Sequence, residues 1–117
     1  MAYSLLQDYD KAIVEFKAAL RIASRFNVAR NNLGNTYYKK KDFLKAEKIF
    51  QESLEIFSED IEAYKNLVNV YAALGRKKES QERLEKVINI LEKEKMFDQA
   101  EDLRRILDSE AFNKEDY

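Results

Sequence analysis

Asparagine is the residue whose side chain and spacing most clearly predict a binding chemistry in this sequence. Asn32 and Asn35 recur as Asn66 and Asn69 after an interval of 34 residues. A side-chain amide donates to a carbonyl and accepts from an N–H at the same time, so a ladder of asparagines can hold a peptide backbone without reading its side chains. Each such bond contributes only about 0.5 to 1.5 kcal/mol, so a ligand must make several. The candidate surface consists of Asn31, Asn32, Asn35, Tyr38, Lys65, Asn66 and Asn69.

Two interpretations of these asparagines remain open. They bind a ligand, or they only fill a solvent-exposed helix face. Asparagine is a mediocre helix former, so its use at five of the seven positions favours a binding role.

Catalytic chemistry has few residues available to it. The sequence contains no cysteine and no histidine, which excludes disulfides, thiolate catalysis and zinc–thiolate sites and removes the commonest general base and metal ligand. The carboxylates fall mainly where helices begin or on exposed faces, and no motif pairs two of them across a pocket. We therefore expect no enzyme activity, no cofactor and no metal site.

The elements that position the asparagines are expected to be helices. The 117 residues include no proline and only two glycines, while Ala, Leu, Glu and Lys are abundant. With 21 basic and 22 acidic side chains the net charge is −1, so we expect neither nucleic acid nor a membrane as a partner. No apolar run approaches the roughly 20 residues that span a bilayer, and the N-terminus has no signal-peptide pattern. We expect a cytoplasmic protein.

Apolar residues repeat at the same 34-residue interval as the asparagines. The forward matches pair Leu33 with Leu67, Tyr37 with Tyr71, Ala46 with Ser80 and Phe50 with Leu84. The backward matches pair Tyr37 with Tyr3, Ala46 with Ala12 and Phe50 with Phe16. Within each unit the apolar residues recur at steps of three and four, which predicts a pair of amphipathic helices per repeat.

The segment 27–60 resembles a tetratricopeptide repeat (TPR), because Leu33-Gly34, Tyr37, Ala46 and Phe50 fall at the family's spacings. It departs from the family pattern at Arg30, where Trp is usual, and at Ser58, where Pro is usual. The resemblance implies an all-α, right-handed α-solenoid of antiparallel helix hairpins. It also implies that the first helices of successive repeats line a concave groove, which takes up an extended peptide or a helix of a partner protein.

We predict a single TPR-like domain over residues 1–117. It comprises a partial repeat (1–26), two full repeats (27–60 and 61–94), a capping helix (95–112) and a tail (113–117). In the partial repeat, residues 1 to 6 are expected to end a first helix, and Asp8 to cap the second. Either the chain is a fragment of a longer array, or another subunit covers its first hairpin.

Individual residues are expected to end helices or to let them approach. Asn27 is a candidate cap for the next helix, the turn at residues 58–60 offers further caps, and Gly75 suits a left-handed helix end. Asp98 with Glu101 has the form of a capping box that starts a final helix ending at about residue 112. Close helix contacts are expected at Ala12, Gly34, Ala46 and Ser80.

The favoured function is a protein-interaction module that binds a partner through the asparagine surface. The carboxylate clamp of chaperone-binding relatives is expected to be incomplete, because Asn31 stands where that motif has lysine. One alternative is a structural scaffold that self-associates through the truncated N-terminal repeat, burying Tyr3, Leu5, Leu6, Ile13 and Phe16. Another is weak binding of RNA or an acidic partner at a basic edge made of Lys39, Lys40, Lys41, Arg76, Lys77 and Lys78. These cations also suit the helix dipole alone.

Overall fold

All regular secondary structure in the described part of the chain is helical. The structure is a computed structural model that describes the backbone of residues 2–115 and the side chains of residues 8–108. Its helices are α1 (Ala2–Ile22), α2 (Asn27–Lys39), α3 (Phe43–Ile56), α4 (Ile61–Ala73), α5 (Lys77–Lys93) and α6 (Phe97–Glu115). Residues 2–115 contain no strand, and the predicted all-α class is confirmed.

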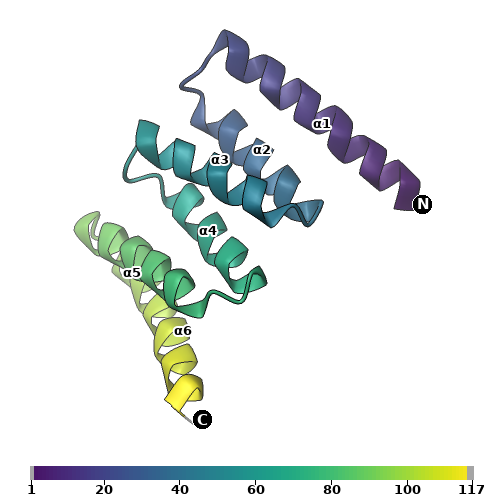
Figure 1. Cartoon of the computed structure of the whole chain (residues 1–117). Helices are drawn as coiled ribbons and strands as arrows, with labels where there is room; N and C mark the ends of the chain where they lie inside the picture. The colour runs from purple at the N-terminus through teal and green to yellow at the C-terminus, as the bar shows by residue number, and fades with distance from the viewer. Residues whose placement is uncertain (1, 116–117) are drawn as a thin grey trace.

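Consecutive helices pack side by side in a stack of antiparallel pairs, with α1 at one end and α6 at the other (Figure 1). Helix α2 also contacts α4, whereas α3 and α5 do not contact each other. Between the two central hairpins, the first helices therefore touch while the second helices stay apart. As a result α2 and α4 form the inner face of a curved solenoid, and α3 and α5 form its outer face.

Helix α1 differs from the prediction. Residues 1 to 6 were expected to end one helix and Asp8 to cap another, but a single helix runs from Ala2 to Ile22. No glycine or proline lies within it, and most of its residues are good helix formers, so nothing interrupts the backbone hydrogen bonds. The side chain of Tyr3, which was expected at the tyrosine position of a repeat, lies outside the described residues.

The apolar core consists of two clusters that α4 joins. In the first, Phe50 of α3 and Tyr71 of α4 are 0% and 1% exposed. The second lies between α4, α5 and α6, where Leu91 is 1% exposed and Ala100 is 2% exposed. Tyr64 and other residues of α4 pack against this second cluster. Because α4 contributes to both clusters, the two repeats and α6 form one continuous core.

Small residues bring the paired helices together at three of the four expected positions. A Cβ atom added to Gly34 would lie 2.7 Å from Cε1 of Phe50, so glycine is required there although it costs about 1 kcal/mol in a helix. Ala46 and Ser80 are buried at equivalent positions of α3 and α5. Ala12 is only half-buried, and α1 contacts only α2 among residues 2–115, so the close hairpin contact expected at Ala12 does not form.

Three helices end with a residue in the left-handed conformation. Gly75 follows α4 with φ 75°, which confirms the expected helix end. Lys41 occupies the equivalent place after α2 with φ 67°, and Lys95 follows α5 with φ 62°. A side chain is unfavourable in this conformation, so the two lysines carry backbone strain that Gly75 avoids.

Of the predicted helix caps, only the one at residue 60 forms. Asp60 precedes α4, and its carboxylate accepts a hydrogen bond from the N–H of Ala63 at 3.2 Å. Asn27 is the first residue of α2 rather than its cap, because its side chain is hydrogen-bonded to α3 and Asp60 instead. Asp98 lies within the first turn of α6, so the expected capping box with Glu101 is also wrong.

Candidate functional site

A polar hollow lies between α2 and α4 on the inner face of the solenoid. Its volume is about 190 Å³. Its lining residues are Val28, Asn31, Asn32, Asn35, Glu62 and Asn66. Because α2 and α4 contact each other, amides that are 34 residues apart in sequence, such as Asn32 and Asn66, reach the same site.

Asp60 fixes the polar groups at one end of this hollow. Its Oδ2 accepts hydrogen bonds from Nδ2 of Asn27 at 2.9 Å and from Nδ2 of Asn31 at 3.0 Å. Asn27 also donates to the carbonyl oxygen of Ser53 at 3.1 Å. These bonds link α2, α3 and the start of α4, so the relative position of the two inner helices is set by side-chain hydrogen bonds as well as by apolar packing.

Asn31 is therefore a supporting residue rather than a free ligand-binding group. Its amide nitrogen donates a hydrogen bond to Asp60, which fixes the orientation of the side chain. Its Oδ1 is buried without a hydrogen-bond partner among the described residues. The other amides of the hollow have no side-chain hydrogen bond to a described residue, so Asn32, Asn35 and Asn66 offer both donors and acceptors to a ligand.

The structure brings together four of the seven predicted surface residues. Tyr38 packs instead against Phe43, with ring centroids 5.4 Å apart and planes inclined at 60°, and contributes to the core. Lys65 and Asn69 are exposed on α4 but do not line the hollow. Of the predicted residues, those in the hollow are Asn31, Asn32, Asn35 and Asn66.

Sequence reasoning missed two lining residues, Val28 and Glu62. They are 34 residues apart, at the same position of two successive repeats, so the interval that found the asparagines could also have found this pair. Val28 is 63% exposed and gives the hollow an apolar wall. Glu62 is the only charged residue among those that line the hollow.

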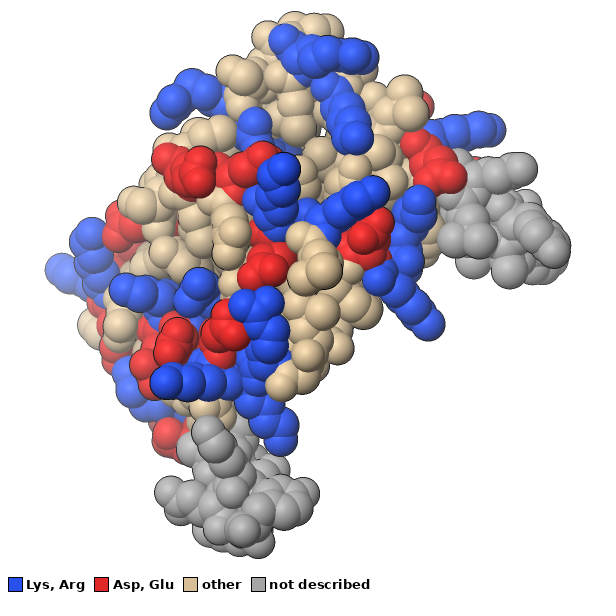
Figure 2. Space-filling model, viewed as in Figure 1, with Lys and Arg blue, Asp and Glu red and all other residues tan. Residues whose placement is uncertain are grey.

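The predicted basic edge is partly neutralised by acidic side chains. The Lys40 amine lies 2.7 Å from the Asp10 carboxylate, and this hydrogen bond raises the lysine pKa. Arg76 binds Glu79 and lies 3.3 Å from Glu47, and its hydrogen bond to Glu79 raises the arginine pKa. Figure 2 shows basic and acidic side chains intermixed over the face it presents. Two of the six cations of this edge, Lys40 and Arg76, therefore form solvated ion pairs with described residues.

The proposed self-association surface on α1 is partly used inside the chain. Ile13 is 8% exposed and belongs to the first core cluster, and Phe16 packs against the same cluster. Ile13 is therefore unavailable to another subunit and its inclusion in that surface is wrong, whereas Phe16 is only half-buried and its inclusion stays a prediction. Tyr3, Leu5 and Leu6 lie outside the residues whose side chains are described.

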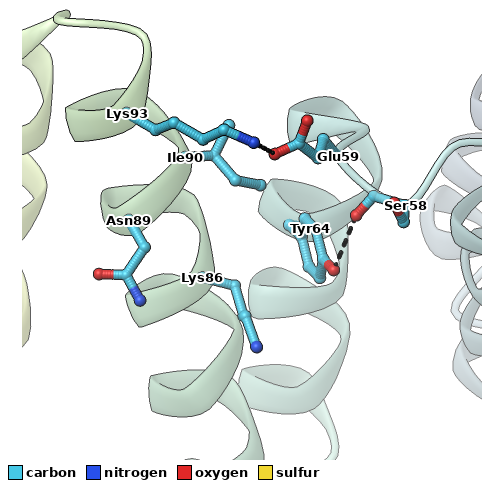
Figure 3. Close-up of a pocket in the computed structure, with 7 residues that line it drawn as sticks. All are labelled: Ser58, Glu59, Tyr64, Lys86, Asn89, Ile90 and Lys93. Carbon is cyan, nitrogen blue, oxygen red and sulfur yellow. Dashed lines mark hydrogen bonds and ion pairs between the residues drawn. The ribbon is translucent and has the colours of Figure 1, made fainter.

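A second hollow lies between α5 and the turn before α4, with a volume of about 240 Å³ (Figure 3). The Tyr64 hydroxyl donates to the carbonyl oxygen of Ser58 at 3.0 Å, and the Lys93 amine lies 2.8 Å from the Glu59 carboxylate. The hydrogen bond to Glu59 raises the pKa of Lys93. Since these four residues already pair with one another, this hollow presents fewer uncommitted polar groups than the inner one.

Two other kinds of site are absent from the described residues. No helix there is long and apolar enough to cross a membrane. No group of three or more acidic side chains in the same part of the chain is arranged to hold a metal ion.

A stack of helical hairpins with a polar hollow on its inner face defines the chain as a helical-repeat protein. The family model described as Tetratricopeptide repeat matches residues 1–59 and 25–93, which together span most of the chain. The chain belongs to the tetratricopeptide repeat family, and it is a module for protein–protein interaction as members of this family generally are. Among curated proteins, none matches it in sequence.

Two solved structures show the same fold. The type III secretion translocator chaperone SycD of Yersinia enterocolitica, in a crystal structure described as an alternative dimer, has a TM-score of 0.74 at 12% identity, over 94% of this chain and 88% of that chain. The crystal structure of MamA has a TM-score of 0.67 at 20% identity, over 93% of this chain and 72% of that chain. At these identities the similarity establishes the arrangement of helices alone.

Proposed function

We propose that the chain binds an extended segment of a partner protein on the inner surface formed by α2 and α4. The observation that carries the proposal is that asparagines from both helices line one hollow with their amides uncommitted. Asn32, Asn35 and Asn66 are the binding residues, because each amide can pair with a backbone N–H and a backbone carbonyl of the bound segment.

The size of the hollow favours a polypeptide over a small molecule. Its volume of about 190 Å³ lies below the roughly 300 to 1,000 Å³ of small-molecule and cofactor sites. It suits one side chain, while the backbone on either side of that side chain runs along the inner faces of α2 and α4. Asn31 supports this surface by holding the start of α2 against Asp60.

Selection from a phage-displayed library of random linear peptides tests the proposal. Peptides enriched on the wild-type chain are synthesised, and their affinity is measured by fluorescence anisotropy for the wild type and for the Asn32→Ala, Asn66→Ala double variant. Loss of one amide bond from each helix is expected to weaken binding about fivefold to 150-fold, because each bond contributes about 0.5 to 1.5 kcal/mol.

Asn89→Ala is the matched control. Asn89 is an exposed asparagine on α5 that lines the second hollow, between α5 and the turn before α4, instead of the inner one. Its replacement by alanine is therefore expected to leave peptide affinity unchanged. Equal affinity of the selected peptides for the wild type and the double variant would contradict the proposal. A loss of peptide affinity in Asn89→Ala alone would instead indicate that the binding site is the second hollow.

A further inference from the structure

The charge of the inner hollow points to the kind of side chain that it accepts. Glu62 on α4 is the one ionisable residue among its lining residues, and the others are four amides and a valine. Glu62 makes no ion pair with any described residue, including Lys65 one turn further along the same helix. Glu62 is solvent-exposed where it lines the hollow. Its carboxylate can therefore accept hydrogen bonds from a ligand, and no described cation neutralises its charge.

The surrounding groups add acceptors, and no cation among the described residues is paired with Glu62. Arg30, the nearest arginine in sequence, is bound to the carbonyl oxygen of Ser24 at 2.6 Å and to Oδ1 of Asn27 at 3.4 Å. The side-chain carbonyls of Asn32, Asn35 and Asn66 accept hydrogen bonds but cannot neutralise a carboxylate. A ligand group with a positive charge and several N–H donors therefore complements this site, whereas a carboxylate would meet repulsion from Glu62.

Val28 supplies the remaining part of the match. It is 63% exposed and lies on α2 at the position equivalent to Glu62 on α4, so the hollow has an apolar wall and a carboxylate at matching positions of its two helices. Lysine and arginine side chains combine the two complementary properties, because each has an aliphatic stem and a positively charged end. The stem packs against Val28, and the charged end binds Glu62 with one or more amide oxygens.

We infer that the inner hollow is a specificity pocket for a single lysine or arginine side chain of the bound segment, with Glu62 as the residue that selects it. This inference rests on the proposed function, because it specifies one contact of the same bound segment. It predicts a partner whose binding segment carries a cation at one fixed position, with the asparagines holding the backbone around it.

The test compares peptides selected on the wild-type chain with those selected on Glu62→Lys. We expect lysine or arginine to be enriched at one fixed position on the wild type, and that preference to be lost, or replaced by Asp or Glu, on Glu62→Lys. Glu85→Lys makes the same charge change at an exposed position of α5 that forms no ion pair with the side chains of residues 8–108, so it is expected to keep the wild-type preference.

A double-mutant cycle with one selected peptide separates the direct contact from a general charge effect. Replacing the fixed lysine or arginine of the peptide by glutamine is expected to weaken binding to the wild type roughly threefold to tenfold, as for an exposed to half-buried ion pair, but to have little effect on Glu62→Gln. Equal weakening in both would overturn the inference. So would selected peptides that depend on Asn32 and Asn66 but have no cationic position, and that result would leave the proposed function intact. Peptides that do not depend on those asparagines would overturn both.

Discussion

At the scale of single residues, Asp60 connects the stability of the fold to the shape of the candidate site. It is 8% exposed, it caps α4, and it accepts the amide protons of Asn27 and Asn31. The same carboxylate thus caps α4 and is hydrogen-bonded to the N-terminal part of α2. A residue that satisfies three donors from two helices has no equivalent substitute among uncharged side chains of its size.

Replacement of Asp60 by alanine is expected to destabilise the chain by about 2 to 3 kcal/mol. The loss of a helix cap contributes about 0.5 to 2 kcal/mol, and the amide donors left without an acceptor add a desolvation cost. Urea unfolding followed by circular dichroism measures this change. Asp42→Ala is the control, because Asp42 precedes α3 at the equivalent place but makes no side-chain cap bond. Equal destabilisation by the two substitutions would show that the Asp60 network contributes nothing beyond a local charge.

At the scale of helices and turns, the sequence predicted what depends on local pattern. The 34-residue interval placed the helix pairs, Gly34 and the turn at Gly75, because apolar periodicity and glycine chemistry are properties of short segments. It was wrong about the break before Asp8 and the cap at Asn27. Those features depend on the neighbours of each helix: α1 contacts only α2 among residues 2–115, and the Asn27 side chain is hydrogen-bonded to α3 and Asp60.

The candidate site was predicted only in part for the same reason. The repeat interval identified asparagines on two helices, but which of them share a hollow is set by the contact between α2 and α4. Tyr38 has the helical position of a surface residue and yet packs on Phe43, since burying an aromatic ring is more favourable than exposing it. Glu62 was not among the predicted site residues, so the one charged side chain that lines the hollow was missed.

The turns that follow α2 and α4 predict how substitutions at their left-handed residues change stability. Lys41 and Gly75 occupy equivalent left-handed positions with φ 67° and 75°. Lys41→Gly is expected to stabilise the chain by roughly 0.5 to 1 kcal/mol, because the strain of a side chain in this conformation outweighs the added backbone entropy of glycine. Gly75→Ala should destabilise it by about the same amount, since a Cβ there would meet no atom within 4 Å and only the backbone is affected.

Chemical unfolding of the two variants beside the wild type measures both changes. Opposite signs are expected for the two substitutions. If Lys41→Gly instead lowered the free energy of unfolding, the lysine stem or charge would have to contribute more than the backbone strain costs.

At the scale of the whole molecule, stability is distributed along the stack. Helix α4 packs against α2, α3 and α5, whereas α1 contacts only α2 and α6 contacts only α5 among the described residues. In a solenoid each unit is stabilised by its own fold and by its neighbours, so units with a neighbour on one side unfold more readily. The inner hollow lies between the helices that have the most neighbours, which keeps its asparagines in fixed positions before a partner binds.

Native-state hydrogen exchange is therefore expected to show a gradient along the chain. Amides in the middle of α2 and α4 should exchange most slowly, and those of α1 and α6 several-fold to many-fold faster, because opening an end helix exposes one interface instead of three. Mass spectrometry of peptic fragments after timed labelling measures these rates.

A bound peptide carrying the selected lysine or arginine should slow exchange in α2 and α4 and leave α6 unchanged, since only α2 and α4 line the hollow. A uniform exchange rate through all six helices would contradict the gradient and would mean that the stack unfolds as a single unit.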